Sequence, residues 1–179
     1  MTLKLHLGCG EKFIPGFTHI DVIKFPNVDV VSAVDKLPMI KDDSVDLIYA
    51  CHVLEHFNKK QVPAVLTEWR RMLKTEGILR LAVPNFKVLA QMYVEGKATL
   101  DQVHGPILGG QTYLYNFHYT LFDPKSLEKY LTDAGFRTIR EWSWRTTEHA
   151  DLDDFSQAYL PHMDKEFGTL ISLNLEAVK

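Results

Sequence analysis

The sequence predicts an α/β fold, in which helices cover a largely parallel sheet. Strand-like segments alternate with helical segments through the middle of the chain, which implies crossover connections between parallel strands. A glycine turn, Gly8-Cys9-Gly10, ends the first of these strands. The chain has 179 residues, 46% of them hydrophobic and 24% charged, which suits one domain over residues 1–179. This composition excludes disordered, collagen-like and coiled-coil proteins.

The predicted strands are short apolar or alternating runs that end at turn residues. The first covers residues 3–7, and the second covers residues 17–22. Between them, Pro15-Gly16 leaves no room for a long helix. Further strands are expected at residues 28–31, 45–50, 78–83, 137–144 and 170–178. The last of these alternates apolar with polar residues.

Helical spacing of apolar residues marks three segments. The first segment, residues 61–74, has basic side chains near its C-terminal end. Gly77 is its predicted C-cap. Residues 86–94 form a second predicted helix. A third begins at Asp123-Pro124, an N-cap followed by proline, and ends before Gly135. These helices lie between predicted strands, as a parallel sheet requires.

Two long segments, residues 97–122 and 147–168, show neither the helical nor the strand period. Irregular segments of this length in a compact domain are usually binding loops, so we expect both to build a substrate pocket; plain surface connections are the alternative. Aromatic residues in and near them would suit a carbohydrate platform, although core packing explains most aromatics. They are Tyr113, Tyr115, Phe117, Tyr119, Trp142 and Trp144.

The glycine turn and a nearby acid predict a nucleoside site. Ligands of open parallel sheets bind at the carboxyl ends of the strands, where glycine lets the backbone approach closely. Asp21 ends the second strand with a carboxylate that can accept both ribose hydroxyls. A third glycine and a helix N-terminus, which would hold a pyrophosphate, are missing. A nucleoside without phosphate therefore fits better than a dinucleotide.

Several stretches resemble class I S-adenosylmethionine-dependent methyltransferases, especially the small methyltransferase-11-like branch. They occur in the family's order at residues 5–10, 19–22, 35–39, 42–57 and 68–79. The resemblance implies a single doubly wound, mostly parallel, Rossmann-like sheet with an antiparallel last strand at residues 170–178. It also implies S-adenosylmethionine as cofactor. The residues that it implies for cofactor binding are His6, Gly8, Cys9, Gly10, Asp21, Val22, Asp35, Leu37, Ala50 and His52.

The chain departs from the family at three points, one of which is the missing third glycine of the motif. His6 stands where the family usually has an acid, and a loop replaces the full helix that usually joins the glycine motif to the ribose acid. These departures concern the methionine part of the cofactor more than its ribose.

The segment from His52 to His56 matches H-x-x-E-H, a zinc-protease pattern. A protease would carry it in a long helix with a third ligand downstream, whereas here it directly follows a strand, and Pro63 interrupts any long helix. We therefore expect no metal. Glu55 and His56 are instead expected to orient the turn through hydrogen bonds, or to cap and pack.

Methyl transfer to a hydroxyl needs one well-placed base, and histidine suits that role at neutral pH. The predicted catalytic residues are His118 and His52, with His104 as a further candidate. His118 comes first because it lies beside an amide and two aromatic residues in a predicted pocket loop. A loop without a catalytic histidine is the alternative for each of them.

Charge and composition limit the partners. With 20 Lys and Arg against 23 Asp and Glu, the net charge is −3, which does not suit nucleic-acid binding. No apolar run approaches the roughly 20 residues of a membrane span. The start of the chain lacks a signal-peptide core, and its two cysteines form no disulfide framework, so a cytoplasmic protein is expected.

The predicted function is S-adenosylmethionine-dependent methylation of a small polar acceptor, with a sugar or glycan hydroxyl favoured. Two alternatives stay open. One is an NAD(P)-linked oxidoreductase or epimerase on a similar fold. The other is a non-catalytic module that binds S-adenosylmethionine. Because one fold can host many activities, the fold alone does not decide between them.

Overall fold

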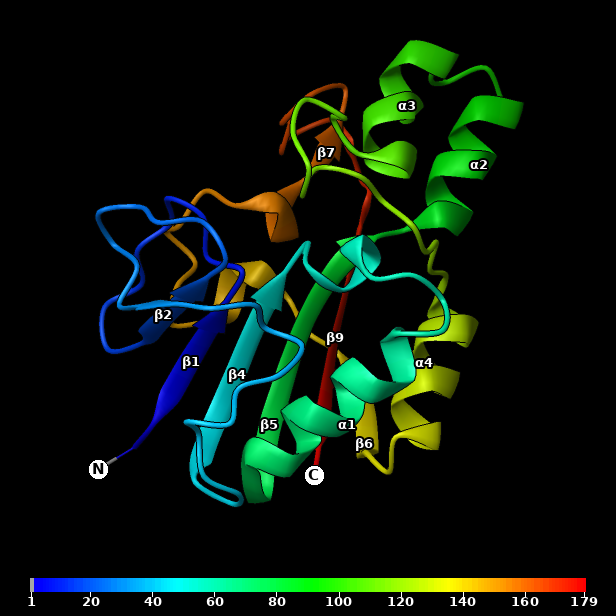
Figure 1. The fold of residues 1–179 in the computed structure, drawn as a ribbon. Helices are drawn as coiled ribbons and strands as arrows, with labels where there is room; N and C mark the ends of the chain where they lie inside the picture. The colour runs from blue at the N-terminus through cyan, green and yellow to red at the C-terminus, as the bar shows by residue number, and fades with distance from the viewer. Residues whose placement is uncertain (1) are drawn as a thin grey trace.

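The computed structural model describes residues 2–179 and contains a seven-stranded sheet in the order β3-β2-β1-β4-β5-β9-β6 (Figure 1). Strands β1 to β5 are parallel, while β9 runs antiparallel to both β5 and β6. The Rossmann-like sheet with an antiparallel last strand is therefore confirmed. The bounds are β1 Lys4–Leu7, β2 Thr18–Asp21, β3 Val30–Val31, β4 Val45–Cys51, β5 Leu73–Pro84, β6 Arg137–Glu141 and β9 Ser172–Val178.

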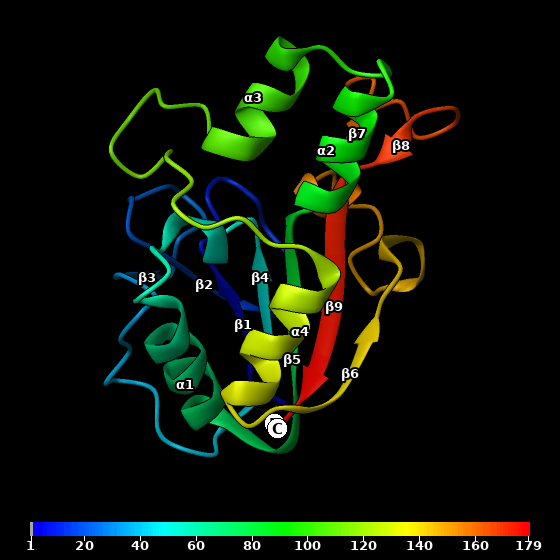
Figure 2. The same ribbon diagram turned by 90° about the vertical axis from the view of Figure 1, so that its right-hand side faces the viewer.

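Helices α1 (Val62–Met72) and α4 (Pro124–Asp133) lie side by side on one face of the sheet (Figure 2). Helices α2 (Phe86–Val94) and α3 (Leu100–Leu108) lie beyond the carboxyl ends of the strands. No helix within residues 2–179 has both the length and the apolar character needed to cross a membrane. Thus one pair of helices builds the core, and the other pair lies above the ligand-binding edge of the sheet.

The main core fills the space between the sheet and helices α1 and α4. Apolar side chains from alternate positions of β1, β4, β5 and β9 meet the apolar faces of these helices. Trp69 is fully buried there, and its indole Nε1 donates a hydrogen bond to the Val34 carbonyl at 2.8 Å. Other members are Leu5, Ile48, Leu66, Leu79 and Leu175.

Loops and short 3-10 helices cover the opposite face of the sheet. Ile14 and Phe17, from the loop between β1 and β2, pack there with Tyr49 and with Trp142. The later chain adds η2 (Trp144–Thr146) and η3 (Phe155–Gln157), followed by the pair β7 (Tyr159–Leu160) and β8 (Thr169–Leu170). The polar side chains of the alternating strand β9 are therefore buried under this cover; they are Ser172, Asn174 and Glu176.

Two local predictions were wrong. Gly77 is not a helix C-cap, because the chain becomes extended at Leu73 and Gly77 lies within β5. A Cβ on Gly77 would stand 2.9 Å from the Lys74 carbonyl oxygen, so close backbone packing explains the glycine. The segment 97–122 is not wholly irregular, because helix α3 begins inside it with a capping box formed by Thr99 and Gln102.

The loop at η1 (Leu54–His56), between β4 and α1, completes the described architecture. It follows the end of β4 directly, so its residues lie at the carboxyl edge of the sheet (Figure 1). The shortened connection between β1 and β2 is confirmed as a loop, with turns in place of a helix. The carboxyl edge of the sheet is therefore framed by short loops from the first half of the chain.

Candidate functional site

A cavity of about 1480 Å³ lies at the carboxyl edge of the sheet. Its walls come from the turn after β1, the end of β2, the loop after β4, helix α3 and both late loops. Ligands of doubly wound sheets bind at this edge. The expectation that residues 97–122 and 147–168 contribute to the pocket agrees with the cavity walls, which include Tyr113 from the first segment and Met163 from the second.

The two glycines of the first turn have different surroundings. Gly8 has φ +61°, and a Cβ there would lie 2.4 Å from a Val53 methyl carbon. Gly10 has φ +52°, but a Cβ there would meet nothing within 4 Å. Gly8 thus allows the turn to pack against Val53, whereas Gly10 leaves space free on the cavity side.

Asp21 lines the cavity beside this turn and is 8% exposed. One carboxylate oxygen accepts a hydrogen bond from the Gly10 backbone N–H, and the other accepts one from the Ile23 N–H, both at 2.8 Å. A carboxylate has about four lone-pair positions, so each oxygen can still accept a ligand hydroxyl. The backbone therefore fixes Asp21 in an orientation that suits the expected ribose contact.

His6 and Cys9 present uncharged groups to the cavity. Burial, reinforced by His19 and His149, lowers the pKa of His6 to about 3. Its Nδ1 atom is buried and makes no hydrogen bond to any residue in the range 2–179. Burial, and then the carboxylate of Asp21, raise the pKa of the Cys9 thiol to about 12. A neutral imidazole with a free nitrogen therefore stands where the family usually has an acid.

The structure places the ten predicted cofactor residues in two groups. Those that line the cavity are His6, Gly8, Cys9, Gly10, Asp21, Val22, Asp35 and His52. Leu37 and Ala50 are instead buried in the core beneath helix α1. Ala50 lies on the helix-covered face of β4, and Leu37 packs inward while its backbone N–H donates to Glu68. Because Leu37 and Ala50 are buried in the core, their side chains do not reach the cavity.

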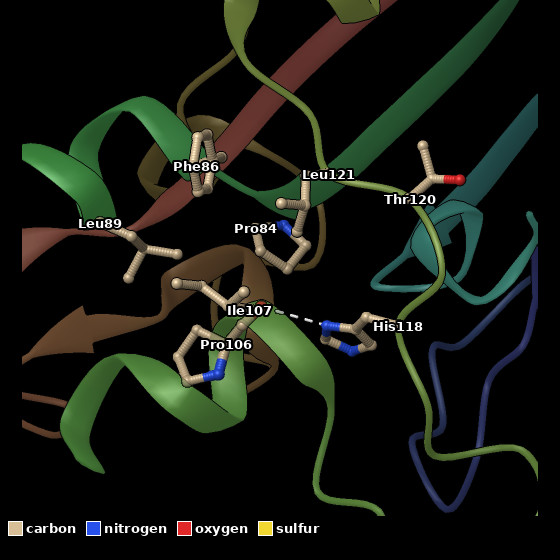
Figure 3. Close-up of a pocket in the computed structure, with 8 residues that line it drawn as sticks. All are labelled: Pro84, Phe86, Leu89, Pro106, Ile107, His118, Thr120 and Leu121. Atoms are coloured by element: carbon tan, nitrogen blue, oxygen red, sulfur yellow. Dashed lines mark hydrogen bonds between the residues drawn. The ribbon is translucent and has the colours of Figure 1, made fainter. Parts of the chain in front are cut away.

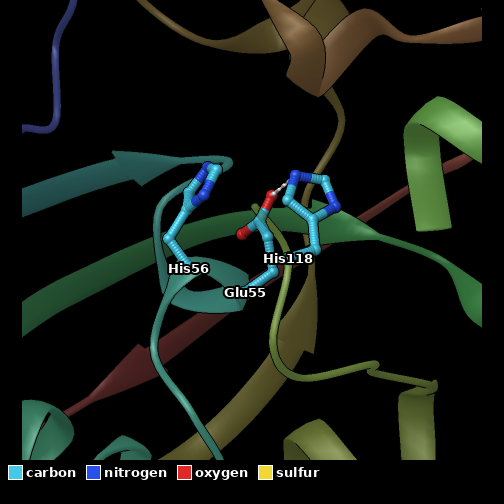
Figure 4. Close-up of side chains that lie close together, drawn as sticks. All are labelled: Glu55, His56 and His118. Atoms are coloured by element: carbon cyan, nitrogen blue, oxygen red, sulfur yellow. Dashed lines mark ion pairs between the residues drawn. The ribbon is translucent and has the colours of Figure 1, made fainter. Parts of the chain in front are cut away.

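The two predicted catalytic histidines meet around one buried carboxylate. His52 follows β4 with φ +53°, and its Nδ1 lies 3.2 Å from Glu55 Oε1. His118 comes from the loop between α3 and α4, and its Nε2 lies 4.0 Å from the same oxygen (Figure 4). The loop is fixed there because the Tyr119 backbone N–H donates to the Glu55 carbonyl at 2.8 Å.

Hydrogen bonding fixes the ring of His118. Its Nδ1 lies 3.1 Å from the Pro106 carbonyl oxygen of helix α3 (Figure 3). Apolar side chains of α2 and α3 surround this contact, and the gap between them is too small for a water molecule. Because a carbonyl only accepts, Nδ1 donates in this contact, and Nε2 is the ring nitrogen directed toward Glu55.

The electrostatics of this cluster favour a charged carboxylate. Burial by itself would raise the pKa of Glu55, but His52, His56 and His118 together lower it below its usual range. Burial likewise lowers the pKa of His118, against the opposing effect of Glu55. Sequence reasoning gave Glu55 and His56 only supporting roles. In the sequence, the H-x-x-E-H pattern indicated that Glu55 and His56 could act together. It did not indicate His118, which lies far along the chain.

Exposed aromatic side chains line the outer part of the cavity. Tyr113, Tyr115, Tyr119 and Phe155 are between 48% and 60% exposed. Core packing therefore does not account for the three tyrosines of the predicted aromatic set, to which the structure adds Phe155. It does account for Trp142, and neither Trp142 nor Trp144 lines the cavity. Aromatic faces of this kind are suited to stacking against the apolar face of a ligand.

Residues 17–81 match the family model described as a methyltransferase domain. No match was found among curated proteins. Among solved structures, the chain is similar to an S-adenosylmethionine-dependent methyltransferase from Thermotoga maritima, with TM-score 0.63 and 15% identity over 100% of this chain and 83% of that one. A second, from Archaeoglobus fulgidus, has TM-score 0.58 and 17% identity over 99% and 86%.

A third similar structure is an N1-methyltransferase from Burkholderia thailandensis with bound 1,6-didemethyltoxoflavin and S-adenosylhomocysteine. It has TM-score 0.61 and 14% identity over 99% of this chain and 70% of that one. The family match and the shared fold confirm the resemblance to class I S-adenosylmethionine-dependent methyltransferases. They also support S-adenosylmethionine as the cofactor, which fits the free lone pairs of Asp21 and the open space beside Gly10.

Proposed function

We propose that this chain transfers a methyl group from S-adenosylmethionine to a small polar acceptor, with a sugar or glycan hydroxyl as the favoured acceptor. One observation carries the proposal: the nucleoside residues and both predicted catalytic histidines line the same cavity. When bound, the cofactor supplies a methyl group that its sulfonium has already activated. The protein's main contribution is then to hold the acceptor in line with that group.

On this proposal, Asp21 accepts the ribose hydroxyls, and its two backbone hydrogen bonds keep the carboxylate in place. Gly10 lets the ligand approach the backbone of the turn, because no atom fills the space beside it. His6 borders the cavity beneath the turn, where its ring packs beside Phe17, His19 and Tyr49. These roles follow from position in the cavity and from hydrogen-bonding capacity.

The acceptor would lie between the strand ends and the aromatic loop. Tyr113 and Tyr115 are half-exposed and border the cavity, which suits stacking on a sugar ring. His52 and His118 line the same space and would contact the acceptor's reacting hydroxyl. A single domain over residues 1–179 and a cytoplasmic location belong to this proposal, and the unpaired Cys9 and Cys51 support the location.

Calorimetry with S-adenosylhomocysteine tests the cofactor site. We expect binding to the unaltered chain and a loss of at least about tenfold, or 1.4 kcal/mol, in Asp21→Ala, because the ribose loses its acceptor. Asp133→Ala is the matched control, since Asp133 is exposed on α4 and does not line the cavity. Absence of binding at millimolar ligand, or unchanged affinity in Asp21→Ala, would contradict the assignment.

A methylation screen tests the acceptor. The protein is incubated with S-adenosylmethionine and with nucleotide sugars, glycans or small acids, and a product heavier by one methylene unit is sought by mass spectrometry. Tyr115→Ala should raise KM for the acceptor, whereas Phe167→Ala, at an exposed position outside the cavity, should not. Binding of S-adenosylhomocysteine without methylation of any acceptor would favour the non-catalytic module.

A further inference from the structure

Glu55 is a buried carboxylate that the fold leaves without hydrogen bonds. Its exposed fraction is 1%, and neither oxygen accepts a hydrogen bond from the residues described, 2–179. His52 is at ion-pair distance, with Nδ1 3.2 Å from Oε1, but without hydrogen-bond geometry. Burying a carboxylate without compensating partners is costly, so such a group needs a specific explanation.

Two imidazoles surround this carboxylate in a way that suits a metal ion. One ligand atom each from Glu55, His56 and His118 lies within 4.8 Å of the others, and the side chains converge from two loops (Figure 4). Bonds of about 2.0–2.2 Å to one tetrahedral ion place donor atoms about 3.4 Å apart. The 4.0 Å between Glu55 Oε1 and His118 Nε2 therefore closes with a small inward movement.

The outer contacts of both histidines match those of metal ligands. His56 Nδ1 lies 3.0 Å from the Phe117 carbonyl oxygen, and His118 Nδ1 lies 3.1 Å from the Pro106 carbonyl oxygen. Each carbonyl accepts a hydrogen bond from Nδ1, so Nε2 is the ring nitrogen left for a metal ion. Ligating histidines in proteins almost always donate their second ring nitrogen in this manner. This observation is independent of the clustering itself.

We propose that Glu55, His56 and His118 bind a divalent transition-metal ion, with zinc as the first choice. Two imidazoles and one carboxylate are a set that zinc uses where it keeps a further position open for water or substrate. His56 and His118 line the large cavity, so this open position faces it. His52 stays outside the ligand set and orients the carboxylate from 3.2 Å.

This site revises the sequence-based expectation of no metal. A zinc protease with this H-x-x-E-H pattern would need a third ligand downstream, and the sequence offered no evidence for one. The fold brings His118 to Glu55 and His56 from the loop before α4. The site also deepens the proposed function, on which its role rests: His118 would act on the acceptor hydroxyl through the ion that it holds and not by direct contact. An acceptor hydroxyl in the open position would be oriented by the ion and would lose its proton to solvent more readily.

Metal titration of the full chain tests the site. After dialysis against a chelator, we expect calorimetry to show one equivalent of zinc bound with a Kd in the micromolar range or tighter. His56→Gln and His118→Gln should each weaken binding by at least about 100-fold, because each removes a ligand. His104→Gln is the matched control, since His104 is exposed on α3 and outside the cavity wall, and it should bind as the unaltered chain does.

Cobalt(II) gives a second measurement that needs no variant. We expect the unaltered chain to bind one cobalt ion with visible absorption bands of a four- or five-coordinate site, which added zinc removes. Absence of zinc binding, absence of these bands, or equal zinc affinity in the folded His118→Gln variant would overturn the site. Loss of binding in His104→Gln would overturn it too.

Different variants distinguish the metal site from the cofactor site. Asp21→Ala should lose affinity for S-adenosylhomocysteine and keep zinc, while His118→Gln should lose zinc and keep S-adenosylhomocysteine. Zinc binding in a chain that does not bind S-adenosylhomocysteine would overturn the proposed function and leave the metal site in place.

Discussion

Two neighbouring rows of residues cross the sheet one position apart and face opposite ways. One row is wholly apolar and lies beneath helices α1 and α4; it contains Ile20, Leu7, Ala50, Leu81 and Leu175. The other row is polar and lies beneath the loops; it contains His19, His6, Tyr49, Arg80 and Glu176. Both rows are almost completely buried, so burial alone does not distinguish the two faces.

The difference lies in what compensates for burial. The apolar row gains from leaving water, and any packed helix face can cover it. The polar row needs partners: Glu176 pairs with Arg80 at 2.8 Å and with Arg140 at 2.9 Å, and Arg80 also pairs with Glu148. Arg80 and Arg140 lie on the neighbouring strands β5 and β6, and the covering loop adds Glu148, a charged partner that an apolar helix face lacks. Helices therefore stabilise one face, and hydrogen-bonded loops complete the other.

The largest expected effect is on the helix-covered face. Trp69→Ala should lower the free energy of unfolding by about 3–5 kcal/mol, because it leaves a cavity among fully buried neighbours. Trp142→Ala, on the loop-covered face, should cost clearly less, since Trp142 is only partly buried. Urea unfolding of both variants makes the comparison. Equal losses would show that the loops pack as tightly as the helices.

The second effect concerns the polar row. Glu176→Ala should cost about 3 kcal/mol, because the side chain of Arg80 is only 11% exposed and keeps the half-exposed Glu148 as its one carboxylate partner among residues 2–179. The double variant Arg80→Met with Glu176→Leu should recover most of this loss, since an apolar pair needs no compensating charge. Urea unfolding at neutral pH provides the values. A double variant no more stable than Glu176→Ala would mean that the ion pairs are needed for stability.

The same contrast explains which parts of the fold could be predicted. Helices α1 and α4 were predicted because each turns an apolar stripe toward the sheet. Helix α3 was missed because Val103 is its only fully buried residue, so its apolar period is weak. Its capping box at Thr99 and Gln102 was the available signal. The burial of Glu176 could not be predicted, because its alternation with apolar residues is typical of an exposed face.

The residues of the candidate site also differ in how well the sequence predicts their positions. The cavity positions of Gly10 and Asp21 follow from local rules, since both stand at the ends of predicted strands and ligands bind at such ends. The approach of His118 to Glu55 depends on tertiary contacts, such as the backbone hydrogen bond from Tyr119 to Glu55. No pattern within either segment encodes that contact. Sequence therefore predicted the cavity positions of Gly10 and Asp21 better than the cluster around Glu55.

The third effect arises at the glycine turn, where core and cavity meet. Gly8→Ala should cost about 2 kcal/mol or more, since it combines a positive φ with a methyl group 2.4 Å from a carbon atom of the Val53 side chain. Gly10→Ala should cost only about 1 kcal/mol, because its methyl group enters open space. Gly10→Ala should nevertheless weaken S-adenosylhomocysteine binding, because that space belongs to the cavity. Equal stability losses would contradict the packing of Gly8 against Val53.

The smallest effect, counted per pH unit, is on the pH dependence of stability. Burial holds the pKa of His6 at about 3 in the folded state, against an ordinary value of about 6.5 in the unfolded chain. Below pH 6.5 the unfolded chain therefore binds a proton that the folded chain does not. The free energy of unfolding should therefore fall as pH decreases, by about 1.4 kcal/mol per unit between about pH 6 and pH 4 on account of His6. Burial also lowers the pKa of His149 and His118, which adds to the slope.

His6→Leu isolates the share of His6 in that slope. The variant keeps an apolar side chain of similar size and has no proton to gain, so its stability should depend less steeply on pH than that of the unaltered chain. Urea unfolding at pH 7, 6, 5 and 4.5 measures both slopes, with His104→Leu as an exposed control. Parallel curves for His6→Leu and the unaltered chain would mean that His6 gains a proton as readily in the folded state. The polar row would then tolerate a charge that its burial beside His19 and His149 should exclude.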